Sequence, residues 1–196
     1  MAISNKLQRY LQDSKVKYVA AKHPVAYTAQ ELAAAQHVPG RQVAKSVLVK
    51  TARGNVLVVL PAITLIDFKK LKSVLGGGSL SIAKESDIKA QFPDVEVGAM
   101  SPFGNLYGVP VVVDSMLSQA DDIAFNAGSH TDTLKMKYKD FAALVHPKSG
   151  SFGLPIQGPK KHAAKRSGAK KKTTRKPPAR RSPAKKPSHK QSKRRR

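Results

Sequence analysis

The sequence predicts a mixed α/β (α+β) fold: a single compact domain with a curved, barrel-like mixed sheet flanked by short helices, followed by a disordered basic tail. Three observations favour this class. Short runs rich in β-branched residues alternate with short amphipathic segments. Two of the runs are separated by a tight turn, which predicts a hairpin. No regular strand–helix–strand repeat appears, which argues against a doubly wound parallel sheet.

Charge divides the chain into two parts. The 196 residues carry 36 Lys+Arg against 12 Asp+Glu, a formal charge of +24. Residues 159–196 hold 18 of these basic residues and no acidic residue, which leaves +6 for residues 1–158. We therefore predict a globular domain over residues 1–157, long enough to bury a core, and a disordered Lys/Arg/Pro-rich tail over residues 158–196.

Composition excludes several kinds of site. There is no cysteine, so disulfides, thiolate metal sites and cysteine nucleophiles are excluded. The six histidines form no HExxH motif and no i, i+4 pair, so we predict no metal and no other cofactor. No run of about 18 apolar residues is present, and no signal-type apolar region follows Met1–Lys6. We expect a soluble, cytoplasmic protein with no membrane partner.

The helices and strands follow from periodicity and from caps. Leu7, Tyr10 and Leu11 form an i, i+3, i+4 stripe, and Thr28 with Glu31 forms a capping box. In chain order we expect helices over residues 4–14, 28–36, 67–75, 87–92 and 138–145, and strands over residues 16–21, 43–50, 56–60, 80–83, 95–100, 109–114, 123–126 and 133–136.

The later elements depend on turn residues and on apolar runs. Arg53–Asn55 predicts the turn of the hairpin, and Asp67 is placed to cap a helix that Gly76–Gly78 ends. Val95–Met100 has strand character before a Gly/Pro loop. Val109–Asp114 is almost continuously apolar, which is typical of a buried strand.

The strand Val43–Lys50 carries a lysine on an apolar face. Alternation along a strand places Lys45 on the same side as Val47 and Val49. A buried ammonium group is costly unless it has a partner or a wet cleft. Either the head of Lys45 reaches solvent while its stem covers apolar surface, or the charge serves a site.

Two glycine-containing loops are the other candidates for chemistry. Gly98–Pro102 offers backbone amides, and Gly128–His130 offers a tight turn with an imidazole. Taken singly, these residues also fit an ordinary turn and a surface histidine. Asp121 and Asp122 point to opposite faces of a strand, which does not suit an acid–base pair. There is no GxSxG serine elbow and no phosphate-binding GK[ST] loop.

Three motifs together resemble the YbaK/ProRS-associated editing domain, an aminoacyl-tRNA deacylase family. They are Val43–Val49, Val97–Gly104 and Phe125–Thr131, with Thr28–Glu31 upstream, and the resemblance runs from about Val16 to Val145. It implies a mixed α/β domain with a barrel-like sheet. It also implies hydrolysis of mischarged aminoacyl-tRNA, either within prolyl-tRNA synthetase or by a free-standing trans-editing factor.

The resemblance also implies the site residues. By correspondence of motifs, the catalytic set is Lys45, Gly98, Gly128 and His130, and the substrate-binding set is Ser46, Ala99, Met100, Ser101, Pro102 and Ser129. The histidine of the late turn is similar to that of the alanine-editing branch of the family. One departure is Ala99, where many relatives carry a second glycine, and the basic tail lies outside the family pattern.

The expected function is trans-editing, with Ala-tRNA(Pro) as the substrate. An aminoacyl ester is already activated, so loop amides that stabilise the oxyanion would suffice. A water molecule, or the vicinal ribose hydroxyl assisting from the substrate, would serve as or activate the nucleophile. Lys45 would anchor the substrate as a cation, because an ordinary lysine is a poor base at neutral pH. The alternatives are a Cys-tRNA(Pro) deacylase, a non-catalytic nucleic-acid-binding protein that acts through its tail, and an inactive relative that senses aminoacyl ligands.

The tail predicts a polyanionic partner. Flexible cationic side chains gain affinity by releasing counterions and do not read sequence. We expect tRNA as the partner, with DNA or the ribosome as alternatives and prolyl-tRNA synthetase as a further partner. The basic residues chosen for this contact are Lys170, Lys171, Lys172, Arg175, Arg180, Arg181, Arg194, Arg195 and Arg196.

Overall fold

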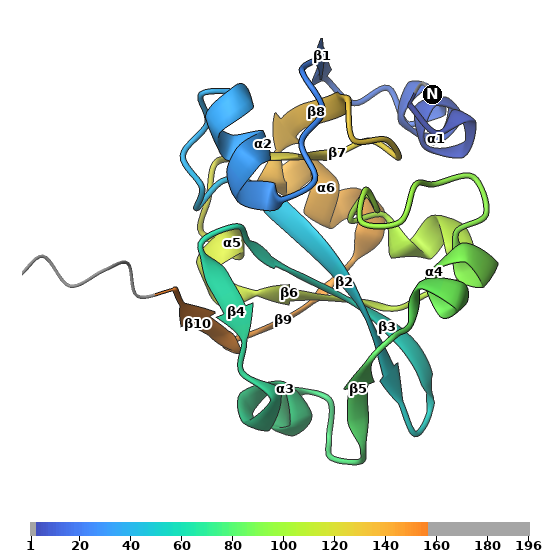
Figure 1. Ribbon diagram of the computed structural model, residues 1–196, viewed down its shortest axis with the longest axis vertical. Coiled ribbons are helices and arrows are strands. Elements are labelled where there is room, and N and C mark those ends of the chain that lie inside the picture. Colours follow the sequence, from blue (N-terminus) through green and yellow to red (C-terminus); the bar gives the residue numbers. More distant parts are fainter. Residues whose placement is uncertain (1–2, 157–196) are drawn as a thin grey trace, which may run out of the picture. The chain divides into compact units, whose positions relative to one another are not determined.

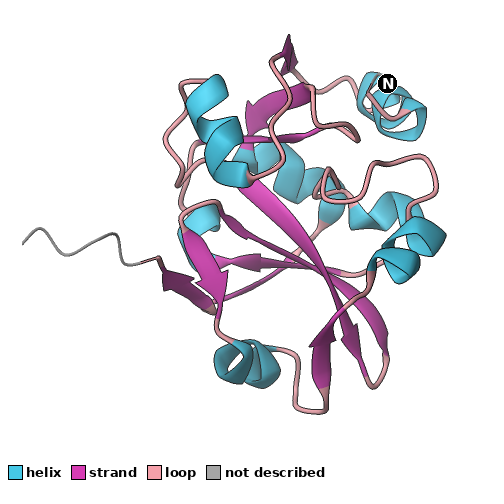
Figure 2. Ribbon diagram, in the orientation of Figure 1, coloured by secondary structure: helices cyan, strands magenta, loops and turns pink. Residues whose placement is uncertain are grey.

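The computed structural model describes residues 3–156, and these form a mixed α/β domain, as the sequence predicts (Figures 1 and 2). The helices are α1 Asn5–Asp13, α2 Ala29–Ala35, α3 Phe68–Val74, α4 Glu85–Gln91, the 3-10 helix η1 Gly104–Tyr107, α5 Ser115–Ser118 and α6 Tyr138–Val145. The strands are β1 Tyr18–Lys22, β2 Ala44–Thr51, β3 Gly54–Pro61, β4 Thr64–Ile66, β5 Leu80–Ile82, β6 Val111–Asp114, β7 Asp122–Asn126, β8 Asp132–Lys137, β9 Lys148–Gly150 and β10 Gly153–Pro155.

The strands form three ladders. The largest has the order β5-β2-β3-β6-β9 and is mixed, because β2 pairs antiparallel with β3 and β5 while β6 pairs parallel with β3 and β9. The second ladder, β1-β8-β7, is antiparallel, and β10 pairs with β4 in the third. A single parallel bridge between Val43 and Ala124 connects the start of β2 to β7.

Local signals in the sequence set several of the helix ends. Thr28 accepts from the amide of Glu31 while the Glu31 carboxylate accepts from the amide of Thr28, which is the predicted capping box. The carboxylate of Asp67 caps α3 as predicted, and the amides of Gly76 and Gly77 satisfy carbonyls of its last turn. The last predicted helix, residues 138–145, has the bounds of α6.

The predicted strand over residues 95–100 is wrong. This segment contains a turn in which the Ala99 amide donates to the Glu96 carbonyl and Gly98 has φ +91°. That backbone conformation bends the chain away from an extended path, so no strand pairs with it. The elements η1, α5, β4, β9 and β10 were not predicted, because segments of three or four residues depend on tertiary partners more than on periodicity.

The apolar residues of β2 are packed on both faces of the strand. Ala44 and Leu48 belong to the larger core cluster, together with residues of α1, β7, β8 and α6. Val49 belongs to a second cluster and Val47 packs against it, beside β3, α3 and Phe152. Lys45 lies on this second side of the strand, so its face is indeed an inward one.

No helix in residues 3–156 is long and apolar enough to cross a bilayer. The predicted tail, with all nine of its chosen basic residues, lies outside the described residues.

A buried carboxylate fastens the end of the described chain to the sheet. Asp114, at the end of β6, is 2% exposed and accepts from the amides of Met116, Phe152 and Gly153. It therefore caps α5 and fixes the entry to β10 at the same time.

We predict that Asp114→Ala lowers the free energy of unfolding by about 3 kcal/mol, because three amides lose a charged acceptor. Chemical denaturation with a common slope measures this loss. The matched control is Asp121→Asn, since this side chain is exposed and should change stability by less than about 0.5 kcal/mol. Equal effects of the two substitutions would contradict the assignment.

Candidate functional site

A small pocket of about 180 Å³ lies just beyond the bridge between β2 and β7. Lys45 and Asn126 each lie two residues after the bridged pair, where the strands separate. The pocket is lined by Tyr27, Ala29, Leu32, Ala44, Lys45, Ser46, Val47, Gly98, Met100 and Asn126. Four of the predicted site residues therefore meet here, namely Lys45, Ser46, Gly98 and Met100.

Lys45 brings a partly buried positive charge to the pocket. Its ammonium group donates to the carbonyl oxygen of Thr64 in β4. Burial lowers the pKa of Lys45 below the ordinary value for lysine, because desolvation disfavours the charged form. The side chain is thus held at the pocket wall instead of extending freely into solvent.

Two residues of the pocket carry buried polar atoms that lack partners. Within residues 3–156, the Ser46 Oγ and the Asn126 Oδ1 have no hydrogen-bond partner. Such groups carry a desolvation cost, so their presence together in one pocket indicates a place for a polar ligand. Asn126 was not among the predicted residues. The available signal was a polar amide at the end of the otherwise apolar run Ile123–Phe125.

The Gly98 turn approaches the imidazole of His130. Gly98 has φ +91°, and a Cβ there would meet His130 Cε1 at 3.3 Å. A side chain at this position would therefore strain the backbone and crowd the ring. Ala99, the residue that departs from the family pattern, is fully buried and donates its amide to Glu96.

The two glycine loops are bonded to each other. The Gly128 amide donates to the Ala99 carbonyl at 3.2 Å, and the Glu96 amide donates to the Gly128 carbonyl at 2.9 Å. Gly128 has φ +110°, and a Cβ there would lie 3.2 Å from the backbone nitrogen of Ser4. The sequence predicted both loops at one site, and the structure brings them together. The Gly128 amide itself is already occupied by Ala99.

His130 holds two loops with its ring. Nδ1 lies 3.1 Å from the carbonyl oxygen of Ala26 and Nε2 lies 3.0 Å from that of Val97. The backbone amide of His130 donates to the carboxylate of Glu96. Since both ring nitrogens face carbonyl oxygens, this arrangement suits a positioning residue better than a free base.

The remaining predicted residues are not part of the pocket lining. Ser101 and Pro102 are buried and do not line the pocket. Ser129 is 1% exposed, and its hydroxyl donates to the Asp132 carboxylate at 2.7 Å. Although burial opposes the change, hydrogen bonds from Ser129 and Thr131 keep the pKa of Asp132 below its ordinary value.

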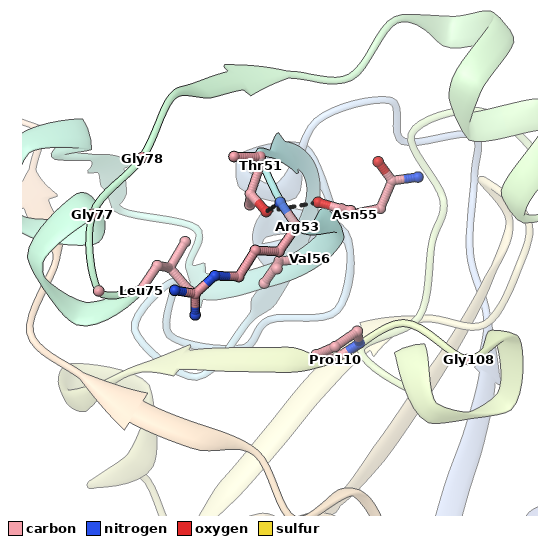
Figure 3. Close-up of a pocket in the computed structure, with 12 residues that line it drawn as sticks. Thr51, Arg53, Asn55, Val56, Leu75, Gly77, Gly78, Gly108 and Pro110 are labelled. Atoms are coloured by element: carbon pink, nitrogen blue, oxygen red, sulfur yellow. Dashed lines mark hydrogen bonds between the residues drawn. The ribbon is translucent and has the colours of Figure 1, made fainter.

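A larger hollow of about 630 Å³ lies at the other end of β2 (Figure 3). The side chain of Arg53 extends across it from the hairpin turn toward Leu75, and Gly76–Gly78 forms one wall. Its lining contains no carboxylate and no histidine. Within residues 3–156, no group of three or more His, Asp or Glu side chains is placed to hold a metal ion.

Residues 23–144 match the aminoacyl-tRNA editing domain family, and the chain belongs to this family. The resemblance predicted from the three motifs is thereby confirmed.

Curated relatives cover part of the chain. The chain is 30% identical over 111 residues to the multifunctional Ser/Thr-tRNA deacylase ProXp-y of Escherichia coli (strain K12). The aligned stretch covers 54% of this chain and 66% of that protein. The chain is 33% identical over 81 residues to the proline–tRNA ligase of Thermosipho africanus (strain TCF52B). This aligned stretch covers 41% of this chain and 14% of that enzyme. The chain thus spans less than two thirds of the length of each relative.

Solved structures agree on the fold. A proposed trans-editing enzyme for prolyl-tRNA synthetase has a TM-score of 0.68 at 20% identity, over 77% of this chain and 96% of that chain. The hypothetical protein APE2540 has a TM-score of 0.70 at 16% identity, over 76% of this chain and all of that chain.

Two serines with buried side-chain hydroxyls, Ser46 in part-buried β2 and the fully buried Ser129, give a test of the unpartnered hydroxyl. We predict that Ser46→Ala changes the free energy of unfolding by less than about 0.5 kcal/mol, because no hydrogen bond is lost. Ser129→Ala should cost about 2 kcal/mol, because Asp132 loses a donor. Denaturant titrations of both variants measure the difference. A Ser46→Ala cost as large as that of Ser129→Ala would show that Ser46 has a structural partner.

Proposed function

We propose that this chain is a trans-editing hydrolase that deacylates mischarged aminoacyl-tRNA. The single observation that carries the proposal is the pocket that joins a partly buried lysine to two unpartnered polar atoms beside a glycine turn. A cation and two polar atoms without partners can bind the polar atoms of a small aminoacyl ester. The family to which the chain belongs acts on such esters, which supports the same conclusion.

Lys45 acts in this proposal as an electrostatic anchor. Its charge attracts the terminal phosphate or the ester carbonyl and is held in place by the Thr64 carbonyl. A water molecule, assisted by the vicinal ribose hydroxyl, adds to the ester carbonyl. The resulting oxyanion then collapses and expels the ribose oxygen, which takes up the proton lost by the water, so the products are the free amino acid and the deacylated tRNA.

Backbone amides would stabilise that oxyanion. The amides of Gly98 and Met100 donate to no acceptor within residues 3–156, and both residues line the pocket. Preorganised amides of this kind are effective because they need no reorganisation as charge develops. Gly128 contributes indirectly by holding Ala99, and His130 contributes by holding the Val97 carbonyl.

The size of the pocket favours a small amino acid, and alanine on tRNA(Pro) is the proposed substrate. Leu32, Ala44 and Val47 supply apolar wall, which suits a methyl side chain and limits larger ones. Serine is the second candidate, since a hydroxyl would satisfy the Ser46 Oγ or the Asn126 Oδ1. A similar protein of E. coli is a Ser/Thr-tRNA deacylase, which also favours this candidate.

Residues 158–196 would add affinity for tRNA in this proposal. Their charge comes from lysine and arginine with no opposing carboxylate, so counterion release is the physical source of binding. DNA and the ribosome are the alternative partners, and prolyl-tRNA synthetase is a further one, supported by the similarity to a proline–tRNA ligase.

The substrate prediction is tested by amino acid release from Ala-tRNA(Pro), Ser-tRNA, Cys-tRNA(Pro) and cognate Pro-tRNA(Pro). We expect Ala-tRNA(Pro) to be cleared and Pro-tRNA(Pro) to be spared by at least about 10-fold, because a pocket discriminates by size at this level. Release of serine in preference to alanine would replace the first candidate by the second. No release from any of the four would leave the non-catalytic nucleic-acid-binding alternative.

The cation prediction uses Lys45→Met, which keeps the length and removes the charge. We expect release to fall by at least about 100-fold, while the free energy of unfolding changes by no more than about 1 kcal/mol. Single-turnover assays and denaturant titrations measure the two effects. Full activity of Lys45→Met would contradict the anchor.

The pH dependence of wild-type activity and stability tests the lowered pKa of Lys45. Because burial lowers its pKa, the charge is lost at a lower pH than for an ordinary lysine, and activity should fall there as pH rises. Between the lowered pKa of Lys45 in the folded chain and its ordinary pKa in the unfolded chain, the unfolded chain binds more protons. The contribution of Lys45 to the free energy of unfolding should therefore rise with pH across this window. Lys45→Met should show neither trend.

The tail prediction compares the full chain with a chain that ends at residue 157. We expect the shorter chain to bind tRNA more weakly and with a smaller dependence on salt, because fewer counterions are released. Equilibrium binding between 50 and 200 mM salt, about the range in which such contacts differ most, measures both. Equal affinity and equal slopes would remove the tail from tRNA binding.

A further inference from the structure

One exposed aromatic residue at the pocket is not used by the mechanism above. Tyr27 is 72% exposed, which is unusual for a large side chain that lines a pocket. It is the only aromatic residue in the pocket lining, and it lies in the connection between β1 and α2, just before Thr28. Its exposure leaves ring surface available to a ligand.

The structure holds Tyr27 from two sides. Its amide donates to the Glu31 carboxylate at 2.9 Å, so the capping box of α2 also fixes this backbone. Hydrogen bonds from the amides of Thr28 and Tyr27 lower the pKa of Glu31, so this acceptor stays charged at neutral pH. The Tyr27 ring packs against the imidazole of His130, with the centroids 4.9 Å apart and the planes tilted by 55°.

The substrate chemistry identifies what can cover this ring. In an aminoacyl-tRNA, the ester and the terminal adenine are attached to the same ribose. When the ester lies in the pocket beside Lys45, the base therefore has to lie at the pocket rim. An exposed aromatic side chain at that rim is a stacking surface for a nucleobase.

We propose that Tyr27 is the stacking platform for the 3′-terminal base of the tRNA. The proposal rests on the proposed function, because it takes the position of the ester from it. Tyr27 contributes affinity for a base and no choice among amino acids, since every base has an aromatic face. The unpartnered atoms of Ser46 and Asn126 remain with the aminoacyl group.

The experiment compares two alanyl-RNA hairpins, one ending in CCA and the other lacking only the final base. For wild type we expect kcat/KM to be roughly 10- to 100-fold higher with the base present, which is the usual range for stacking of one base. Tyr27→Ala should abolish this difference, with most of the change in KM. Tyr27→Phe should keep it, because the ring remains.

The hairpin without the final base tests whether Tyr27 acts only by supporting His130. If Tyr27→Ala slowed both hairpins equally, Tyr27 would act by supporting His130, and the proposal would be overturned. An unchanged difference in Tyr27→Ala would also overturn it. Phe68→Ala provides an exposed aromatic control away from the pocket and should leave the difference intact.

A binding measurement separates this proposal from the proposed function. If wild type hydrolyses neither hairpin, the proposed function fails, and the affinities of the uncharged hairpins then decide the role of Tyr27 alone. Tighter binding of the base-bearing hairpin that is lost in Tyr27→Ala and kept in Tyr27→Phe would support stacking. Equal affinities of wild type for both hairpins would exclude it.

Discussion

The single parallel bridge between Val43 and Ala124 is the contact on which the site depends. It joins the five-stranded ladder to the three-stranded ladder, and one of its hydrogen bonds runs from the Ala124 amide to the Gln42 carbonyl at 2.9 Å. Both bridged side chains are almost fully buried. Because pairing stops there, Lys45 and Asn126 face a gap instead of a continuous sheet. If the two strands stayed paired beyond this bridge, their backbones would lie side by side and leave no space for the pocket.

The pocket contains groups that a stable core would not select. A part-buried ammonium, a buried hydroxyl and a buried amide oxygen belong to residues that line one pocket, and the last two have no partner within residues 3–156. Their cost is tolerable because β2 is packed on both faces by other clusters. Functional sites often contain polar groups without partners that the rest of a fold avoids, because a ligand supplies the missing contacts.

The two glycine loops and α2 form a connected rim around this pocket. Gly128 bonds to Ala99, and the His130 ring lies between the carbonyls of Val97 and Ala26. The same ring supports Tyr27, so residues from three distant parts of the sequence share one set of contacts. These contacts connect the segment just before Thr28 with the motifs at residues 97–104 and 125–131. None of them would position a ligand alone.

The sequence by itself determined the parts that depend on neighbours along the chain. The stripe at Leu7 and Leu11, the capping box at Thr28 and the helix over residues 138–145 are local signals, and the structure contains each of them. Alternation also placed Lys45 on an inward face. Only tertiary structure decided the turn at Gly98, the short strands β4 and β10, and the acceptor of Lys45 in β4. It also decided that Asn126 faces the pocket, because that follows from where two sheets part and not from the periodicity of either strand.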